Sequence, residues 1–482
     1  MSPGRNGIHS SMDHRLSINE NMMELKSIQT IYFIGIGGIG MSALARYFKF
    51  HGRQVSGYDK TETELTKALV AEGIKVHYIE DLQLAPKDAQ LVVYTPAIPK
   101  DNLELSYYQQ NNYTLLKRSD VLGAITSSSF NICVAGTHGK TTVSTMIAHI
   151  LRDSGYGCNA FLGGLAVNYN SNFWSDPRNV CVIEADEYDR SFLKLSPDIA
   201  VITSMDADHL DIYGTAASVE EAFIEFSGKV KPGGLLLAKY GLKRAKELKA
   251  ASRLMYSLDD HGADIYAQNL RVDNGAYVFE VITNKWSLKN VRLNMGGTHN
   301  VENAVVAIAA AHQLEIADTK IRNAVESFRG VKRRFEYVLP YSGSEEDLVF
   351  IDDYAHHPEE LRALISSARK LFPERKCTVV FQPHLYTRTR DFAEGFAESL
   401  DLADEVILLP IYPAREKPIA GVTSKLIAEK MKHAIVHLMN KDELIAWLEK
   451  SGTMKGRLFI TAGAGDIDTI VQAMKEIFEQ TN

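Results

Sequence analysis

The sequence predicts an α/β protein of three domains, each built around a parallel β-sheet. Its 482 residues are enough for about three domains that each bury a core of their own. Short apolar runs alternate along the chain with stretches of helical periodicity, which is the pattern of parallel sheets covered on both faces. Two of these runs lead directly into a glycine-rich turn and then a helix, as in nucleotide-binding domains.

We place the domain boundaries where the composition changes. Residues 28–128 are predicted to form a Rossmann-like domain, residues 129–335 a central ATPase domain of the P-loop type, and residues 336–482 a second Rossmann-like α/β domain. Residues 1–27 are polar and lack the apolar core of a secretory signal, so we expect a disordered extension. The predicted strands lie at 31–34 and 91–94 in the first domain, at 130–134, 180–184 and 199–203 in the second, and at 349–351, 378–381, 406–409 and 458–460 in the third.

Charge and composition exclude several classes of function. The net charge of −7 is spread without long runs, which argues against a partner made of nucleic acid or a membrane surface. No apolar run reaches the roughly 18 residues that a membrane span needs. The four cysteines are scattered in apolar contexts, which indicates reduced core residues rather than disulfides or a zinc site. We therefore expect a cytoplasmic protein, either a monomer or a weak homodimer.

The first glycine-rich turn predicts a site for a diphosphate. The sequence GIGGIG at 35–40 follows a predicted strand and precedes a helical pattern. Its glycines allow a tight turn, a close approach of the backbone to a pyrophosphate, and close packing of the helix on the strand. Asp59 ends the next predicted strand, at the distance expected for an acid that hydrogen-bonds a ribose. These features fit NAD, but they fit other diphosphate-containing ligands equally well.

The second turn, AGTHGKTT at 135–142, predicts a site for ATP or GTP. Backbone N–H groups and a helix N-terminus favour phosphate there, Lys140 can reach the terminal phosphates, and a threonine hydroxyl can face a metal ion. The spacing is shorter than that of a full Walker A motif, because the first glycine of that motif would fall on Val134. The alternative is a glycine-rich turn with a surface lysine. A chain with both turns is suited to spend ATP on a substrate that itself carries a nucleotide diphosphate.

Acidic residues follow two predicted strands of the central domain. The sequence EADEYD at 184–189 follows one strand, and DADHLD at 206–211 follows another. Ligands of parallel α/β sheets lie at the carboxyl ends of the strands, and dense carboxylates repel one another unless a cation lies among them. Thr141, Glu184 and His209 could therefore converge on one or two magnesium ions. A solvated acidic loop is the alternative for the residues after Glu184.

Polar clusters at later positions are more ambiguous. Asn300 and Asn303 lie at the start of an alanine-rich helix, where they could read an adenine edge or where Asn300 could cap the helix. The basic run 329–334 could hold a phosphate or form a solvated turn. Two further clusters, DDYAHHP at 352–358 and the residues His384, Arg388 and Arg390, follow strands of the third domain, where a small acidic co-substrate could bind.

The motifs taken together resemble those of the Mur ligase family. The resemblance extends from about residue 31 to residue 468, in nine ordered motifs, and it explains the shortened P-loop. The motifs are GIGGIGMSALA, AGTHGKTT, EADEYDRSFL, DADHLDIYG, GTHNVENA, FRGVKRRFE, DDYAHHP, FQPHLYTRTRDF and GAGDI.

The resemblance implies an ATP-dependent ligase of the alanine-adding branch of this family, active in peptidoglycan biosynthesis. Such a ligase joins L-alanine to the carboxylate of UDP-N-acetylmuramate through an acyl phosphate, with release of ADP and phosphate and with Mg²⁺ as cofactor. The first glycine-rich turn would then hold UDP rather than NAD. A ligase that recycles muropeptides by adding a preformed peptide is the nearest alternative; an NAD-dependent oxidoreductase and a nucleotide-binding regulatory protein without catalysis are more distant ones.

The resemblance also assigns roles to individual residues. The catalytic set would be Lys140, Glu184, His209, His356 and Arg388. The ATP site would comprise Gly136, Thr137, His138, Gly139, Lys140, Thr141, Thr142, Asn300, Asn303, Arg334 and Asp353. Thr141 and Glu184 would hold one Mg²⁺ and His209 a second. Gly37, Gly38, Ile39 and Asp59 would bind UDP, and Tyr354, His356 and Arg388 would face the amino acid.

A few positions depart from the family pattern. Leu385 stands where many members have Arg, Ser204 where Asn is frequent, and Ala355 where Gly is common, so we carry over no contact for Leu385 or Ser204. Several sister ligases have a carbamylated lysine about 15 residues after the histidine that corresponds to His209. No lysine is present at 222–226, which fits the alanine-adding branch.

Overall fold

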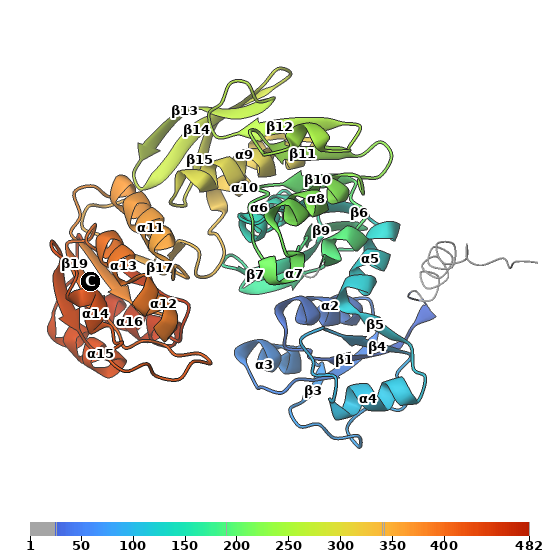
Figure 1. The fold of residues 1–482 in the computed structure, drawn as a ribbon. Helices are drawn as coiled ribbons and strands as arrows, with labels where there is room; N and C mark the ends of the chain where they lie inside the picture. The colour runs from blue at the N-terminus through green and yellow to red at the C-terminus, as the bar shows by residue number, and fades with distance from the viewer. Residues whose placement is uncertain (1–24, 26, 189, 340, 342, 482) are drawn as a thin grey trace, which may run out of the picture. The chain divides into compact units, whose positions relative to one another are not determined.

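The computed structural model describes residues 25, 27–188, 190–339, 341 and 343–481 (Figure 1). The predicted extension at 1–27 lies almost entirely outside these residues. The chain divides into two compact units, one that holds residues up to 164 together with 171–255, and one that holds residues 165–170 and the chain from 256 onward. The three domain boundaries predicted from the sequence stay a prediction.

The first unit begins with a five-stranded parallel sheet in the order β3-β2-β1-β4-β5. β1 pairs with both β2 and β4, so the order of the strands reverses beside β1, where α/β folds of this kind place their ligands. The elements are β1 (Thr30–Ile34), α2 (Ile39–Phe50), β2 (Gln54–Tyr58), α3 (Glu64–Ala71), β3 (Lys75–His77), β4 (Leu91–Tyr94), α4 (Leu103–Gln110), β5 (Leu115–Lys117) and α5 (Arg118–Ser128).

A second run of strands in the first unit has the order β11-β10-β6-β9-β7-β8. The pairs β11/β10, β10/β6, β6/β9 and β9/β7 are parallel, so the carboxyl ends of β6, β9 and β10 lie at one edge. The elements are β6 (Phe130–Ala135), α6 (Lys140–Asp153), β7 (Asn159–Ala166), β8 (Ser171–Trp174), β9 (Val180–Glu184), η1 (Ser191–Lys194), β10 (Ile199–Ile202), α7 (Leu210–Tyr213), α8 (Ala216–Ser227), β11 (Leu235–Lys239), η2 (Ala245–Glu247) and β12 (Arg253–Ser257).

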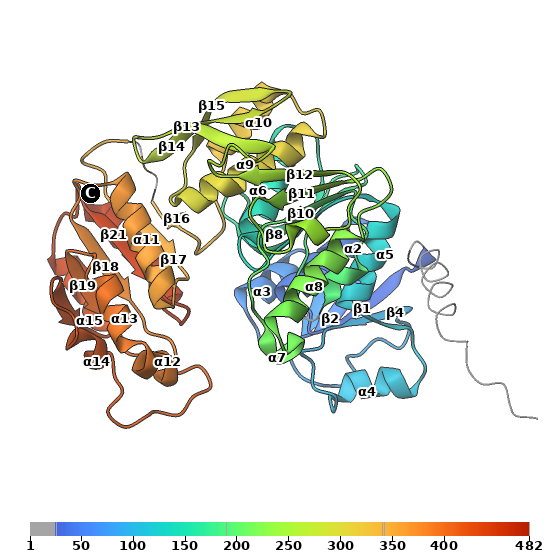
Figure 2. The same cartoon turned by 45° about the horizontal axis from the view of Figure 1, so that its top comes forward.

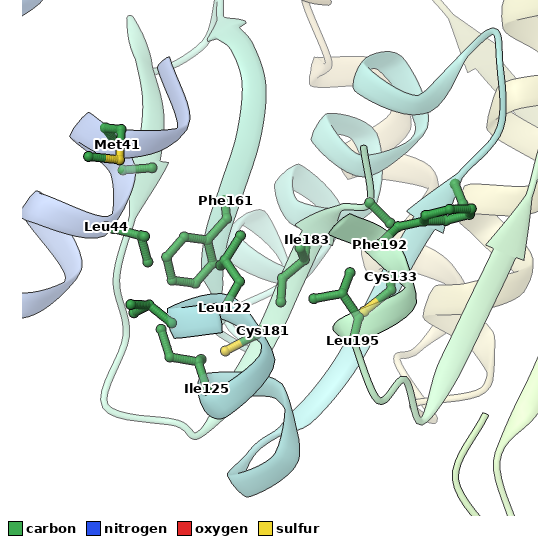
Figure 3. Packing of buried hydrophobic residues seen from close by; sticks show 14 of the residues in the cluster. Met41, Leu44, Leu122, Ile125, Cys133, Phe161, Cys181, Ile183, Phe192 and Leu195 are labelled. Carbon is green, nitrogen blue, oxygen red and sulfur yellow. The ribbon is translucent and has the colours of Figure 1, made fainter. Parts of the chain in front are cut away.

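One apolar core joins the two sheets of the first unit. Met41 and Leu44 of α2 point toward Phe161 of β7, and Leu122 and Ile125 of α5 lie beside them (Figure 3). Each fully buried apolar side chain of this size contributes about 1.5–3 kcal/mol relative to an exposed one. The core therefore holds the helices of the first sheet against the second.

The second unit contains an antiparallel meander that the sequence analysis did not predict. β13 pairs antiparallel with β14, and β14 with β15, in the order β15-β14-β13-β12. In strand β13, buried residues occur only at the start, and most of the later residues are exposed. The sequence of this strand is therefore hard to distinguish from that of a polar loop. The elements are β13 (Ile265–Asp273), β14 (Ala276–Thr283), β15 (Ser287–Leu293), α9 (Thr298–His312) and α10 (Asp318–Ser327).

The second unit also contains a six-stranded sheet in the order β16-β17-β21-β18-β19-β20, in which all strands except β16 are parallel. Helices α15 and α16 pack on one face, and α11 lies alongside the strands and packs against α13 (Figure 2). The elements are β16 (Glu336–Tyr337), β17 (Val349–Asp353), α11 (Pro358–Leu371), β18 (Cys377–Phe381), α12 (Tyr386–Asp391), α13 (Ala393–Leu400), β19 (Glu405–Leu408), α14 (Lys425–Ala428), β20 (Ile435–Leu438), α15 (Lys441–Lys450), β21 (Leu458–Ala462) and α16 (Asp468–Thr481).

These sheets confirm the predicted α/β fold with parallel sheets. In the part of the chain that the structure describes, helices long and apolar enough to cross a bilayer are absent.

Candidate active site

Two glycines shape the turn between β6 and α6, which we call the phosphate cradle (residues 135–142). Gly139 has a φ of 81° and directly precedes the first residue of α6, Lys140. Gly136 has a φ of 137°, and a Cβ there would lie 2.0 Å from the hydroxyl oxygen of Thr203. L side chains rarely adopt such backbone angles, so both positions require glycine. The N-terminus of α6 can then present N–H groups to an anion.

The end of β10 fixes the phosphate cradle from the neighbouring strand. The Thr203 hydroxyl donates to the carbonyl of His138, and the backbone N–H of His138 donates to Ser204 Oγ at 2.8 Å. The Thr137 hydroxyl donates to the carbonyl of Asp206 at 2.8 Å. The cradle is therefore held in shape by protein contacts alone. Ser204, one of the departures from the family pattern, takes part in this.

Lys140 forms a buried ion pair with Glu187. Lys140 Nζ lies 2.8 Å from Glu187 Oε1, and the two side chains are 14% and 2% exposed. Burial raises the pKa of Glu187, and the charge of Lys140 opposes that rise. Glu187 Oε2 is buried without a hydrogen-bond partner among the described residues. Glu187 therefore does not belong to a solvated loop, whereas Asp186 is half-buried and Asp189 lies outside the described residues.

Thr141 and Glu184, two of the three predicted magnesium ligands, are in direct contact. The Thr141 hydroxyl donates to Glu184 Oε1 at 2.7 Å, and the backbone N–H of Gly163 donates to Glu184 Oε2 at 2.7 Å. A Cβ on Gly163 would lie 2.4 Å from that carboxylate, so a larger residue there would displace the end of the Glu184 side chain. Two neighbouring oxygen donors at a phosphate-binding turn suit a hard cation whose other ligands are water and phosphate oxygens.

His209, the third predicted magnesium ligand, contacts Tyr188 and Asp208 rather than this pair. It has a φ of 52° and directly precedes α7. Its ring packs edge-on against Tyr188 with 5.0 Å between centroids, and its Nε2 is 3.7 Å from Asp208 Oδ2. Among the described residues, no three His, Cys, Asp or Glu side chains are grouped as a metal site would require. A second metal at His209 stays a prediction.

A pocket of about 440 Å³ lies between the first glycine-rich turn and Glu184. Gly38 and Ile39 line it from the start of α2, and Arg118 lines it from the start of α5. Gly163 and Glu184 line it from β7 and β9. Two of the predicted UDP-binding residues, Gly38 and Ile39, therefore share one cavity of the first unit with the predicted metal ligand Glu184.

Asp59 hydrogen-bonds the backbone of the first glycine-rich turn. Its Oδ2 accepts the backbone N–H of Gly37 at 2.8 Å, and its Oδ1 accepts that of Thr61 at 3.2 Å. A Cβ on Gly37 would lie 2.8 Å from the same Oδ2. Asp59 thus orients the turn, and its contact with a ribose stays a prediction.

The two asparagines predicted to read adenine are buried at the start of α9 in the second unit. Asn300 Nδ2 donates to the carbonyl of Gly296 at 2.7 Å, and Asn303 Nδ2 donates to Asn300 Oδ1 at 3.1 Å. The helix is preceded by Gly297, and no side chain caps it. Asn300 is therefore not the N-cap residue, and adenine recognition stays a prediction.

In the basic run, Arg333 rather than Arg334 contacts residues at the strand ends of the six-stranded sheet. Arg333 Nη2 donates to the carbonyl of Gly463, its Nε lies 3.4 Å from Asp352 Oδ2, and its guanidinium lies over the ring of Tyr354 at 5.1 Å. Arg334 is exposed. Its predicted contact with ATP stays a prediction.

Two neighbouring carboxyl groups at the end of β17 have raised pKa values. Asp353, predicted to contact ATP, accepts the backbone N–H groups of Phe335 at 2.7 Å and Ala355 at 2.8 Å, and burial nevertheless raises its pKa to about 6. Burial raises the pKa of Asp352 to about 7, against the opposing contacts with Thr461 and Arg333. Desolvation therefore outweighs hydrogen bonding at both positions.

The strand ends of the six-stranded sheet bring together five side chains that we call the strand-end cluster: Tyr354, His356, His384, Arg388 and Tyr412. His356 Nδ1 lies 2.9 Å from the carbonyl of Tyr354, and the rings of His356 and His384 are 6.0 Å apart. His384 stacks on Tyr412 at 5.8 Å, and its Nδ1 lies 3.4 Å from Arg388 Nη1. Burial, followed by the charges of Arg388 and His356, lowers the pKa of His384.

Sequence reasoning missed several residues of these sites. Arg118, Gly163, Glu187 and Tyr412 lie outside the positions to which it gave roles. Arg118 begins α5 and Gly163 lies in β7, two elements that the sequence analysis did not delimit, and the contacts of Glu187 and Tyr412 are tertiary. Leu385, a departure from the family pattern, has a φ of 72° and donates its backbone N–H to the carbonyl of Tyr412 at 2.9 Å.

Comparisons with known proteins agree with this arrangement. Three models match in order: "Mur ligase family, catalytic domain" at 30–129, "Mur ligase middle domain" at 134–311 and "Mur ligase, glutamate ligase domain" at 333–465. The chain is 47% identical to the UDP-N-acetylmuramate–L-alanine ligase of Cytophaga hutchinsonii, over 95% of this chain and 98% of the relative. It is 46% identical to that of Flavobacterium johnsoniae, over 95% and 100%.

A solved structure agrees as well. The UDP-N-acetylmuramate-alanine ligase MurC of Thermotoga maritima is similar with a TM-score of 0.77 and 29% identity, over 94% of this chain and 100% of that one. The similarity in sequence and in structure therefore extends over nearly the whole length of both proteins. This chain belongs to the Mur ligase family.

Proposed function

We propose that this protein uses ATP to join L-alanine to the carboxylate of UDP-N-acetylmuramate, releasing ADP and phosphate, as a step of peptidoglycan biosynthesis. Full-length relatives that are 46–47% identical and are named for this reaction support the proposal. The observation that carries it is the 440 Å³ pocket, which has the first glycine-rich turn on one side and Glu184 on the other. A nucleotide-sugar held at the turn would extend its far end toward the phosphate cradle.

The chemistry requires activation of a poor electrophile. The muramate carboxylate oxygen would attack the γ-phosphorus of ATP, so that the bond to ADP breaks and an acyl phosphate forms. The amine of L-alanine would then attack the carbonyl carbon, and the tetrahedral intermediate would release phosphate as the amide forms. Phosphoryl transfer depends mostly on positioning and on neutralisation of charge. Lys140 would supply positive charge at the β- and γ-phosphates, with Glu187 holding its Nζ in place.

The residues at the phosphate cradle fit one magnesium ion. Thr141 Oγ1 and Glu184 Oε1 would be its protein ligands, since they already lie 2.7 Å apart. When bound, such an ion would offset the negative charge of the phosphate oxygens. Gly163 would keep Glu184 oriented through the contact with Oε2.

The strand-end cluster would receive L-alanine. Arg388 offers a guanidinium for the carboxylate of the amino acid, and a neutral His384 beside it could accept a proton. Tyr354, which is 48% exposed, could cover a small side chain. We further propose that the protein works in the cytoplasm as a monomer or weak homodimer, with neither nucleic acid nor membrane as partner.

The proposal is tested by phosphate release from ATP and Mg²⁺ with UDP-N-acetylmuramate as the acceptor. We expect release that requires both the nucleotide-sugar and L-alanine. Release supported by a peptide that begins L-Ala-γ-D-Glu, but not by L-alanine, would instead identify a recycling ligase. Release without any amine would point to an ATPase.

A further inference from the structure

A buried asparagine links the first glycine-rich turn to the second sheet of the first unit. Asn172 lies on β8 with no exposed surface. Its Nδ2 donates to the carbonyl of Ile39 at 2.6 Å, and its Oδ1 accepts Arg46 Nη1 at 2.8 Å. Nδ2 also lies 3.4 Å from the hydroxyl of Ser42, which itself donates to the carbonyl of Ile39 at 2.9 Å. Both polar groups of the asparagine side chain are therefore hydrogen-bonded to residues of α2.

These contacts hold the wall of the 440 Å³ pocket. Ile39 is the first residue of α2 and lines the pocket, while the opposite side is formed by Gly163 and Glu184. Strand β8 neighbours β7, the strand that carries Gly163. Asn172 thus connects the two sides of the pocket through one strand.

The apolar contacts between α2 and the second sheet do not determine this position by themselves. Met41 and Leu44 pack toward Phe161 (Figure 3), but apolar contacts are not directional and tolerate small sliding movements. Hydrogen bonds require a donor and an acceptor within a few tenths of an ångström, and a buried group that loses its partner is penalised. The polar contacts of Asn172 therefore select one position of the first turn of α2.

We propose that Asn172 is a positioning residue that sets the first turn of α2 relative to Glu184, and thereby sets where the nucleotide-sugar directs its carboxylate. The proposal rests on the proposed function for the identity of that ligand. Asn172 touches neither the phosphate cradle nor the strand-end cluster in the described residues. Loss of the Asn172 side chain should therefore raise KM for the nucleotide-sugar and leave KM for ATP nearly unchanged.

The test compares Asn172→Leu with a matched variant, Asn159→Leu. Leucine has the same number and branching of side-chain heavy atoms as asparagine, adds no charge and removes the hydrogen bonds. Asn159 is also buried, lies on the adjacent strand β7, and donates through Nδ2 to the carbonyls of Asp176, Arg178 and Val180. Both variants lose buried polar contacts in one hairpin, but only the first touches α2.

For Asn172→Leu we expect KM for UDP-N-acetylmuramate to rise about tenfold, the effect of losing a buried hydrogen bond, and KM for ATP to stay within about a factor of two. For Asn159→Leu both KM values should stay near those of the wild type, even where the melting temperature falls. If both variants change the two KM values in parallel, or if Asn172→Leu changes neither, the proposal is overturned.

A second variant covers the case in which Asn172→Leu does not fold. Arg46→Met removes the partner of Asn172 Oδ1 and leaves the bond to Ile39, so a smaller rise in KM for the nucleotide-sugar is expected. An unchanged KM in Arg46→Met would then count against the proposal.

Calorimetric titration with UDP-N-acetylmuramate alone, compared with the turnover assay, separates the proposed function from the role proposed for Asn172. A wild type that binds it but does not turn over contradicts the proposed function, whereas equal affinity of wild type and variant contradicts the role of Asn172.

Discussion

The phosphate cradle and the strand-end cluster differ in the kinds of group that form them. The cradle is made of backbone, two glycines with positive φ and short side chains, and neighbouring strands hold it through hydrogen bonds of 2.7–2.8 Å. The strand-end cluster is made of long side chains from loops and from helix α12, and its rings contact one another at 5.3–6.0 Å. Its hydrogen bond between Arg388 and His384 is long, at 3.4 Å.

This difference indicates which groups are already fixed by the protein and which can still change their contacts when a ligand binds. The cradle is complete before nucleotide binds, because its shape depends on contacts within the protein. The strand-end cluster offers Arg388 and Tyr354 without short contacts between them, so a ligand can still recruit these groups. Substitutions in the cradle should therefore abolish turnover, and substitutions in the cluster should change the affinity for one substrate.

The largest effect is expected for Lys140→Ala. Loss of the charge at the β- and γ-phosphates should lower turnover about a thousandfold, which is the scale for one group that stabilises charge in a transition state. The affinity for UDP-N-acetylmuramate should remain nearly unchanged, since Lys140 does not line the 440 Å³ pocket. Phosphate release and calorimetric titration measure the two quantities.

Lys231→Ala is the matched control. Lys231 Nζ also makes a 2.8 Å contact with a carboxylate, that of Asp198, and lies in the same unit. This variant should lose stability but keep its turnover while folded. A fall in UDP-N-acetylmuramate affinity in Lys140→Ala would show that our division of labour between the two glycine-rich turns is wrong.

Glu184→Gln should have the next largest effect, about a hundredfold loss of turnover at low Mg²⁺. The uncharged amide attracts a cation less strongly, and its NH₂ group is a donor, so it cannot replace the carboxylate oxygen that accepts the Thr141 hydroxyl or the one that accepts the Gly163 N–H. Raising the Mg²⁺ concentration should recover part of the activity. Glu225→Gln, which changes a half-exposed ion pair on α8, is the control. An unchanged Mg²⁺ dependence in Glu184→Gln would remove Glu184 from the metal site.

The same contrast explains how much of the fold and of the sites could be predicted from the sequence. Parallel strands that are buried on both faces read as apolar runs, and the strand at 130–134 was found because the six residues of β6 (Phe130–Ala135) are nearly all buried. The β13–β15 meander was not predicted, because Leu270 and Val272 are exposed apolar residues that break the alternation. Local periodicity therefore predicted the buried sheets and failed at the exposed one.

For the sites, groups that follow parallel strands were expected to meet, and other tertiary pairings were not foreseen. Thr141 was expected to lie near Glu184, because one follows β6 and the other ends β9, and parallel pairing brings these strand ends to one edge. The pairing of Lys140 with Glu187 joins positions 47 residues apart, and no spacing rule predicts it. The sequence analysis assigned a role to Arg334 and none to Arg333. Arg333 has a left-handed φ of 60°, and the sequence does not indicate this backbone conformation or the inward direction of its side chain.

A smaller effect is expected in the strand-end cluster, from Arg388→Lys. Lysine keeps the charge but loses the planar pair of donors that suits a carboxylate. KM for L-alanine should rise about tenfold, with KM for ATP nearly unchanged. Arg390→Lys, two residues along the same helix and paired with Asp391 at the surface, is the control. Equal changes in both variants would exclude Arg388 from the amino-acid site.

The last prediction concerns stability rather than turnover: a dependence of stability on pH arises beside the cluster, at Asp352. Burial raises its pKa to about 7 in the folded protein, above the ordinary value of 3.8. The folded state then binds the proton more tightly than the unfolded state, so this contribution to stability is complete at low pH and is lost as pH rises toward and through 7. Between pH 5 and pH 8 the loss should be roughly 3 kcal/mol.

Asp352→Asn removes this titration, so the variant should gain stability relative to the wild type as pH rises from 5 to 8. Asp404→Asn is the control on the same sheet. Although partial burial acts to raise the pKa of Asp404, the N–H of Cys377 and the Arg369 guanidinium hold it below its usual range. Asp404 is therefore ionised throughout the window, and its variant should show a constant deficit. Thermal unfolding at four pH values distinguishes these slopes. Parallel curves for Asp352→Asn and the wild type would mean that Arg333 keeps Asp352 ionised, with the ion pair outweighing desolvation.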